Sequence, residues 1–168
     1  MGDLYVSWTD YNRTIERLAA NVHKSGWAFN QIVCIARGGL RVGDALSRIF
    51  DAPLAIISTA SDVEEAGNVR GEIVVAKHMT MTTDTLGDTV LLVDDLVDSG
   101  VTLEVVKKHL AAIHPHITDI RTAVLWYKGC SQVKPDYFVD FLPENPWIHQ
   151  PFEPYEQMKP ADLAARMK

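Results

Sequence analysis

Residues 90–93, of sequence VLLV, run directly into two carboxylates and then into a short polar segment. A run of this length and composition predicts a strand that is buried on both faces. Apolar residues at helical spacing follow the polar segment, at Leu103, Val106 and Leu110. A strand, an acidic loop and a helix in this order constrain the chain to an α/β architecture. In such folds, loops at the carboxyl ends of the strands bind ligands.

The polar segment supplies groups suited to phosphate and ribose. Residues 98–102 offer consecutive N–H groups, two hydroxyls and a glycine at the start of a helix, whose dipole favours an anion. We therefore expect a phosphate monoester to bind Asp98, Ser99, Gly100, Val101 and Thr102. Asp94 and Asp95 can hydrogen-bond the two hydroxyls of a ribose and hold Mg²⁺, which prefers oxygen ligands. Turn and cap formation explains any one of these residues, but it explains the whole set badly.

Strands and helices alternate along the rest of the chain. Buried strands are expected at residues 32–36, 54–57, 124–127 and 137–139. A first helix is expected between a cap at Thr9 and a stop at Gly26, and a second follows residues 37–39. Continuously apolar strands that alternate with helices predict a mostly parallel, twisted sheet with helices on both faces, in a Rossmann-like arrangement.

We expect a single domain over residues 1–168, because this length is typical of one domain and 47% of the residues are hydrophobic. Residues 59–88 interrupt the pattern with polar residues and one β-rich stretch at 72–76. An interruption of this length is not a simple connection in a compact domain. It predicts a small flexible lid, or hood, beside the sheet.

Composition excludes several classes of function. A net charge of −6 without a Lys/Arg run argues against nucleic-acid binding, and about 18 uninterrupted apolar residues occur nowhere, so neither membrane spanning nor secretion is expected. The two cysteines form no disulfide framework, which favours a cytoplasmic location. Neither the Walker A pattern nor Gly-x-Gly-x-x-Gly after a strand is present. His114 and His116 flank Pro115 with no partner cluster, so we do not expect them to bind a metal.

Residues 90–102 resemble the phosphoribosyl-pyrophosphate (PRPP) motif of the type I phosphoribosyltransferases, which has four hydrophobic residues, two acids and Asp-Ser/Thr-Gly-x-Thr. From Ile35 to Phe152 the chain is similar to the bacterial xanthine-guanine phosphoribosyltransferases and related hypoxanthine enzymes. The resemblance implies transfer of the phosphoribosyl group of PRPP to N9 of a 6-oxopurine, with release of pyrophosphate. It also implies Mg²⁺ as cofactor, the substrates PRPP and a purine base, and a homodimer or homotetramer.

The same resemblance assigns roles outside the motif. Arg37 and Gly38 are similar to the family's pyrophosphate loop, which often contains a non-proline cis peptide. Arg70 falls where such enzymes carry an arginine that reaches the pyrophosphate when the lid closes. Lys128 matches the lysine that hydrogen-bonds O6 of the purine. Within a base-binding tail at residues 141–168, Trp147 is expected to stack on the base, and backbone groups near Ile148 to contact its edge.

Asp98 and Lys128 are the candidate catalytic residues. Asp98 adjoins both the phosphate loop and the expected base site, so it can relay a proton at N7 of the purine, while Lys128 polarises O6. His149 stands where the xanthine-guanine enzymes carry an acidic residue, which leaves the preferred base open.

Two alternatives stay open: a regulatory protein that senses PRPP or a nucleotide without catalysis, and a transferase for another base. Arg37, Lys128 and Trp147 favour a 6-oxopurine enzyme, because a sensor of the sugar ligand alone has no need of a base pocket.

Overall fold

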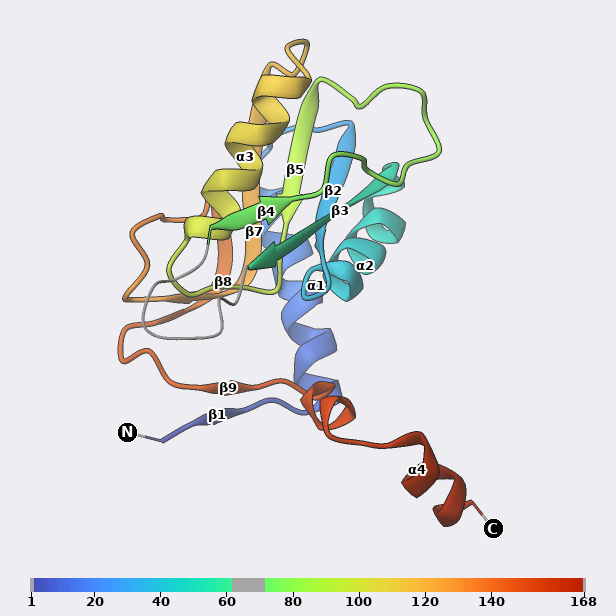
Figure 1. Ribbon diagram of the computed structural model, residues 1–168. Helices are drawn as coiled ribbons and strands as arrows, with labels where there is room; N and C mark the ends of the chain where they lie inside the picture. Colours follow the sequence, from blue (N-terminus) through green and yellow to red (C-terminus); the bar gives the residue numbers. More distant parts are fainter. Residues whose placement is uncertain (1, 62–71, 168) are drawn as a thin grey trace.

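A computed structural model describes residues 2–61 and 72–167 (Figure 1). A seven-stranded sheet forms its centre, with strand order β4-β3-β2-β5-β7-β6 and β8 paired with β7. The strands are β2 (Gln31–Ala36), β3 (Leu54–Ser61), β4 (Ile73–Val75), β5 (Thr89–Val93), β6 (Leu96–Val97), β7 (Asp119–Lys128) and β8 (Tyr137–Leu142). Every pairing in this sheet is parallel except that of β3 with β4. The predicted α/β fold with a mostly parallel sheet is confirmed.

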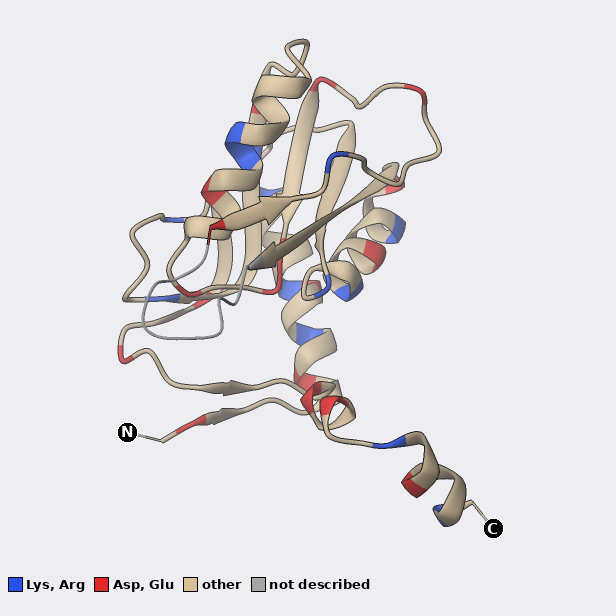
Figure 2. Cartoon of the chain, in the orientation of Figure 1, with Lys and Arg blue, Asp and Glu red and all other residues tan. Residues whose placement is uncertain are grey.

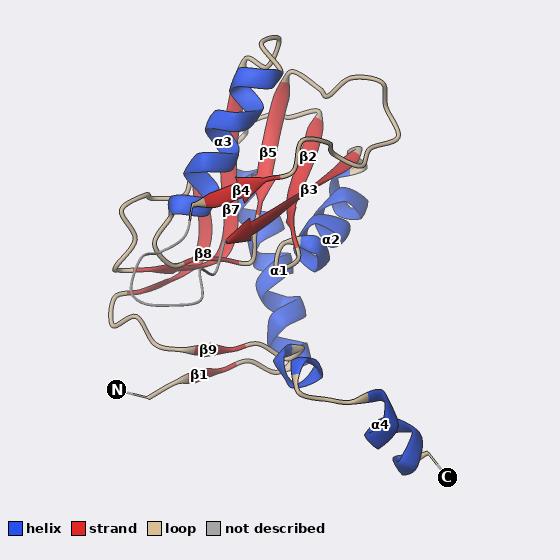
Figure 3. Ribbon diagram, in the orientation of Figure 1, coloured by secondary structure: helices blue, strands red, loops and turns tan. Residues whose placement is uncertain are grey.

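Helices cover both faces of the sheet (Figure 3). Helices α1 (Trp8–Lys24) and α2 (Leu40–Phe50) lie on one face, and α3 (Val101–Ile113) lies on the other. Strand β5 shows why both faces are needed: Leu91 and Val93 enter the core beneath α1 and α2, while Val90 and Leu92 enter the core beneath α3. Successive side chains of a strand point to opposite faces, so a continuously apolar strand requires a layer on each side.

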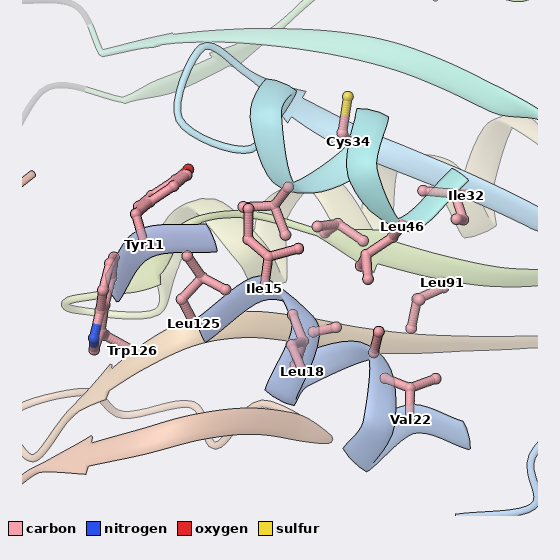
Figure 4. Close-up of a cluster of buried hydrophobic side chains, with 14 of the residues drawn as sticks. Tyr11, Ile15, Leu18, Val22, Ile32, Cys34, Leu46, Leu91, Leu125 and Trp126 are labelled. Atoms are coloured by element: carbon pink, nitrogen blue, oxygen red, sulfur yellow. The ribbon is translucent and has the colours of Figure 1, made fainter. Parts of the chain in front are cut away.

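The larger core joins α1 and α2 to the strands (Figure 4). Tyr11, Ile15, Leu18 and Val22 recur at three- and four-residue spacing along α1 and are all buried. The helix begins two residues earlier than predicted, and its cap is Ser7, whose Oγ accepts a hydrogen bond from the N–H of Asp10 at 3.1 Å. The predicted cap at Thr9 is therefore wrong, because Thr9 already lies inside the helix.

The hairpin expected within residues 59–88 is present in part. Strand β3 continues to Ser61, beyond the predicted end at residue 57, and pairs antiparallel with β4. Thr80 also pairs with Ile56, and Leu86 is buried in the core beneath α3. These parts of the segment extend and cover the sheet. Residues 62–71 lie outside the described part of the chain, and the lid motion stays a prediction.

A strand near the N-terminus lies beside a strand that begins at Ile148, well before the end of the chain (Figure 1). Strand β1 (Leu4–Tyr5) pairs parallel with β9 (Ile148–His149) to form a separate two-stranded sheet. The ring of Tyr5 stacks on that of His149 at 4.3 Å between centroids. A 3₁₀ turn, η1 (Glu153–Glu156), and the short helix α4 (Pro160–Arg166) follow. The N-terminal segment therefore fixes the course of the C-terminal tail.

Lys and Arg residues are spread over several helices and loops in Figure 2, with acidic residues among them. In the described residues no helix combines the length and the apolar character that crossing a membrane requires.

Candidate active site

Two adjacent carboxylates stand where β5 ends. The N–H of Asp95 donates to Oδ1 of Asp94 at 2.9 Å, and the N–H of Leu96 donates to Oδ1 of Asp95 at 2.8 Å. The chain then forms β6, which pairs with Trp126 and Tyr127 of β7. The polar loop expected after residue 93 is thus divided by a short strand. Along the chain, this strand separates the two carboxylates from residues 98–102, which we call the phosphate loop.

Burial dominates the electrostatics of this pair. Asp95 is 9% exposed. Burial raises the pKa of Asp94 well above its ordinary value, the neighbouring charge of Asp95 raises it further, and backbone N–H groups of Asp95 and Gly39 oppose the shift. Such a pair favours a ligand that brings positive charge or hydroxyl donors. Its carboxylate oxygens are the donor type that Mg²⁺ prefers, so the residues present fit this cation.

The phosphate loop surrounds a hollow of about 240 Å³ at the start of α3. Its lining comprises Asp94, Asp95, Leu96, Val97, Asp98, Ser99, Gly100, Thr102 and Leu103. Gly100 caps α3 with φ at 85°, in the left-handed region. Helix N–H groups and the helix dipole favour an anion at this point. Of the residues predicted to bind phosphate, Val101 alone does not line the hollow.

The segment at 130–133 supports the phosphate loop from behind. The N–H of Gln132 donates to the carbonyl of Ser99 at 3.1 Å. A Cβ added to Gly100 would lie 2.7 Å from Oγ of Ser131 and 2.7 Å from Cβ of Val133. The loop therefore needs glycine at residue 100, both for its backbone angle and for this close approach.

The predicted pyrophosphate loop lies against the carboxylates. The peptide bond between Ala36 and Arg37 is cis, as the resemblance implied. A Cβ added to Gly38 would lie 2.6 Å from Oδ1 of Asp95. Glycine at residue 38 therefore allows this loop to approach the acidic pair closely.

Three side chains from distant parts of the sequence form the predicted base site. Lys128 is the last residue of β7, and its side chain is only 9% exposed. Its Nζ lies 3.8 Å from Oδ1 of Asp98 and 5.9 Å from the centroid of the Trp147 ring. The indole of Trp147 is 63% exposed, so one face is open to a stacking partner.

Trp147, but neither Lys128 nor Asp98, lines a cavity of about 850 Å³, which is within the range of about 300–1,000 Å³ typical of ligand sites. Four of its lining residues were predicted from the sequence: Arg37, Gly38, Asp95 and Trp147. Ile148 does not line it, because its side chain is buried in the core; the predicted role of this residue concerns its backbone. Arg70 lies outside the described residues.

Sequence analysis missed three residues of this region. Arg41 lines the cavity from the first turn of α2, four residues after Arg37, and the nearness of a second arginine to the predicted pyrophosphate loop could have revealed it. Gln150 reaches Asp95 from the tail, and no sequence pattern indicates that contact. Cys130, two residues after Lys128, places its Sγ 3.2 Å from Oδ1 of Asp98.

The rings of His114 and His116 lie edge to face, with 5.8 Å between their centroids. His116 Nε2 lies 2.9 Å from the carbonyl oxygen of Leu86. Within residues 2–61 and 72–167, no group of three or more histidine, cysteine or acidic side chains is arranged to hold a metal.

The sheet is mostly parallel, and an acidic pair, a glycine-containing loop at a helix N-terminus and an exposed tryptophan stand near its carboxyl edge. This arrangement defines an α/β protein whose candidate ligand site lies at the carboxyl ends of its strands. The phosphoribosyl transferase domain family matches residues 7–157, and the chain belongs to this family.

Individual relatives agree with this assignment. The chain is 26% identical over 151 residues to a xanthine-guanine phosphoribosyltransferase of Idiomarina loihiensis, which covers 90% of this chain and 87% of the relative. A purine phosphoribosyltransferase from Pyrococcus horikoshii superposes with a TM-score of 0.74 at 30% identity, over 91% of this chain and 95% of that one. A xanthine-guanine-hypoxanthine phosphoribosyltransferase from Helicobacter pylori gives 0.71 at 26%, over 97% of each chain. The recognition made from residues 90–102 is confirmed.

Proposed function

We propose that this chain is a purine salvage enzyme that transfers the phosphoribosyl group of PRPP to N9 of a 6-oxopurine and releases pyrophosphate. The observation that carries the proposal is the buried Lys128, which lies between Asp98 of the phosphate loop and the open face of Trp147. A sugar-phosphate site and a pocket for a planar base with an oxygen substituent thus adjoin. The purine specificity of the relatives supports the same substrate class.

In the proposed complex the 5-phosphate of PRPP binds residues 98–102, and its ribose hydroxyls bind Asp94 and Asp95. Arg37 and the backbone of Gly38 face the pyrophosphate, and Arg70 approaches it from the lid. Asp94 and Asp95 would also hold Mg²⁺, a hard cation that would supply positive charge to the pyrophosphate. The loops thus place PRPP with C1 of its sugar directed towards the base site.

The reaction is a displacement at C1 of the sugar. N9 of the base forms a bond to C1 as the bond from C1 to the pyrophosphate oxygen breaks, and the electron pair leaves with pyrophosphate. Lys128 donates a hydrogen bond to O6, and Asp98 relays the proton at N7. Because C1 becomes electron-deficient, the protein also has to exclude water, which would otherwise attack the sugar.

The preference among 6-oxopurines is set near the purine 2-position. His149 lines the cavity of about 850 Å³, and its ring is already engaged: Nε2 lies 3.0 Å from Oδ2 of Asp3, and Nδ1 lies 3.4 Å from a carboxylate oxygen of Glu153. The hydrogen bond to Asp3 is the main cause that raises the pKa of His149.

The test is nucleotide formation from PRPP and Mg²⁺ with guanine, hypoxanthine, xanthine, adenine and uracil in parallel. We expect turnover of one or more of the three 6-oxopurines and none of uracil. Turnover of adenine or uracil alone would contradict the proposed substrate class. PRPP binding without turnover of any base would instead support a regulatory sensor.

We further propose a cytoplasmic homodimer or homotetramer. The two cysteines, Cys34 and Cys130, are both free thiols, which supports a reducing compartment. Sedimentation equilibrium of the purified chain tests the oligomeric state, and a monomer would contradict it.

A further inference from the structure

The carboxylate of Asp95 is held by two donors from different segments. Its Oδ1 accepts a hydrogen bond from the N–H of Leu96 at 2.8 Å, and its Oδ2 accepts one from Nε2 of Gln150 at 2.5 Å. The first donor belongs to the same loop as the carboxylate. The second belongs to the tail, 55 residues further along the chain. Gly38 of the pyrophosphate loop contacts the same carboxylate, so three segments meet at Asp95.

Gln150 is built into this position. It is 7% exposed and follows β9 directly, so the pairing of β9 with β1 fixes where its side chain starts. A carboxylate only accepts hydrogen bonds, and the amide NH₂ must therefore face Asp95. The opposite end of the amide, Oε1, is buried with no hydrogen-bond partner among the described residues. A buried amide that leaves one end unpaired is costly, which makes a role in local stability alone a poor explanation.

The chemistry of the donor matters as much as its position. In the described residues no ion pair involves Asp95. A neutral amide orients the carboxylate without cancelling its charge, whereas an Arg or Lys at the same place would neutralise it. The negative charge of Asp95 therefore remains available for the ribose hydroxyls and a cation.

We propose that Gln150 is a positioning residue, which orients the Asp95 carboxylate for PRPP and thereby links the base-binding tail to the sugar site. This inference rests on the proposed function. Through Gln150, one hydrogen bond connects the segment that carries Trp147 to the loop that carries Asp95. Loss of the amide should therefore weaken the binding of PRPP and leave the binding of the base unchanged.

The experiment compares Gln150→Met with wild-type chain, using calorimetric binding of PRPP with Mg²⁺ and the KM values for PRPP and hypoxanthine. A hydrogen bond to a charged group predicts a loss of PRPP affinity of about tenfold, with the hypoxanthine KM changed by less than about twofold. Gln150→Asn, whose amide is one methylene shorter, is expected to recover part of that affinity and provides a second test if the first variant does not fold.

Gln31 is the matched control. It is also a buried glutamine, 1% exposed, but its Nε2 donates to the carbonyls of Ile32 and Pro53 at the start of β2, at the opposite end of the sheet from the acidic pair. Gln31→Met should lower the Tm without changing PRPP affinity. Unchanged PRPP affinity in folded Gln150→Met, or an equal rise of both KM values, would overturn the inference.

A double-mutant cycle shows whether Gln150 acts through Asp95. In an Asp95→Asn background, Gln150→Met should cost less than about twofold in PRPP affinity, because the two effects are not additive. Full additivity would contradict the inference. Calorimetry needs no turnover, so an inactive wild-type chain that binds PRPP would refute the proposed reaction and still leave the role of Gln150 open to measurement.

Discussion

Oδ1 of Asp98 interacts with two side chains at once. It forms an ion pair with Nζ of Lys128 at 3.8 Å and accepts a hydrogen bond from Sγ of Cys130 at 3.2 Å. The strand end that carries the lysine is thus fixed to the phosphate loop by groups within three residues of each other. The junction between base site and sugar site is consequently built around one carboxylate.

Asp98→Asn should lower kcat by a factor of about 10²–10⁴, the usual contribution of a general acid or base. PRPP affinity should fall much less, because backbone N–H groups and hydroxyls of the phosphate loop remain. Steady-state kinetics with calorimetric PRPP binding measures both quantities. Equal losses in kcat and in affinity would show that Asp98 only holds the sugar phosphate.

Lys128→Met keeps the length of the side chain and removes its charge. We expect kcat/KM for hypoxanthine to fall about tenfold to a hundredfold, as for loss of a hydrogen bond from a charged donor. Lys134→Met is the control, since Nζ of Lys134 also lies 5.9 Å from an aromatic ring, that of Phe138, but outside the site. A similar loss in both variants would indicate that the positive charge of Lys128 acts only through the overall electrostatic potential of the protein, and not through a hydrogen bond to the base.

Gly100→Ala places a Cβ in a left-handed conformation and against Ser131 and Val133. The backbone angle alone should cost about 1–2 kcal/mol, and the clash should cost more and open the phosphate loop. Gly26→Ala separates these effects, because Gly26 has φ at 71° and open space around it. Chemical denaturation and PRPP titration should show a loss of binding for Gly100→Ala only.

The fold could be predicted further than the site. Residues 32–36, 54–57 and 90–93 are continuously apolar, a pattern that requires burial on both faces, and each of these runs lies in a strand of the sheet. Strand β6 could not be predicted, because its two residues acquire a strand conformation only by pairing with β7. Strands β1 and β9 could not be predicted for the same reason, because each pairs only with the other and most of the sequence separates them.

Within the candidate site, residues with a local signal could be predicted from the sequence, and residues brought in by tertiary contacts could not. Asp94, Asp95 and residues 98–102 follow a buried strand directly, and this local pattern by itself predicts a site for phosphate and ribose. The contact of Gln150 with Asp95 depends on the path of the tail, which periodicity does not reveal. The burial of Lys128 likewise comes from the loops around it, although a lysine at a strand end is usually solvated.

The two cysteines should react very differently with iodoacetamide. Burial is the main cause that raises the pKa of the Cys34 thiol to about 11, and its side chain is fully enclosed by the core. Cys130 is exposed, although desolvation and its hydrogen bond to Asp98 raise its pKa as well. Because the thiolate is the reactive form, labelling of both residues should speed up as the pH rises.

In the folded protein at mildly alkaline pH, mass spectrometry should find Cys130 modified and Cys34 protected. Denaturant should remove the difference. Equal labelling of both cysteines in the native protein would mean that the region of β2 opens readily to solvent. PRPP should slow the reaction of Cys130, since a ligand on the phosphate loop covers its neighbour Asp98.

The pairing of β1 with β9 has a consequence for synthesis. A ribosome makes Leu4 long before Ile148, and at about 5–20 residues per second the first strand waits on the order of ten seconds for its partner. Until then Gln150 and Trp147 do not exist, although the strands of the sheet and the phosphate loop are already made. A nascent chain therefore contains the proposed sugar-phosphate loops before it contains the proposed base-binding tail.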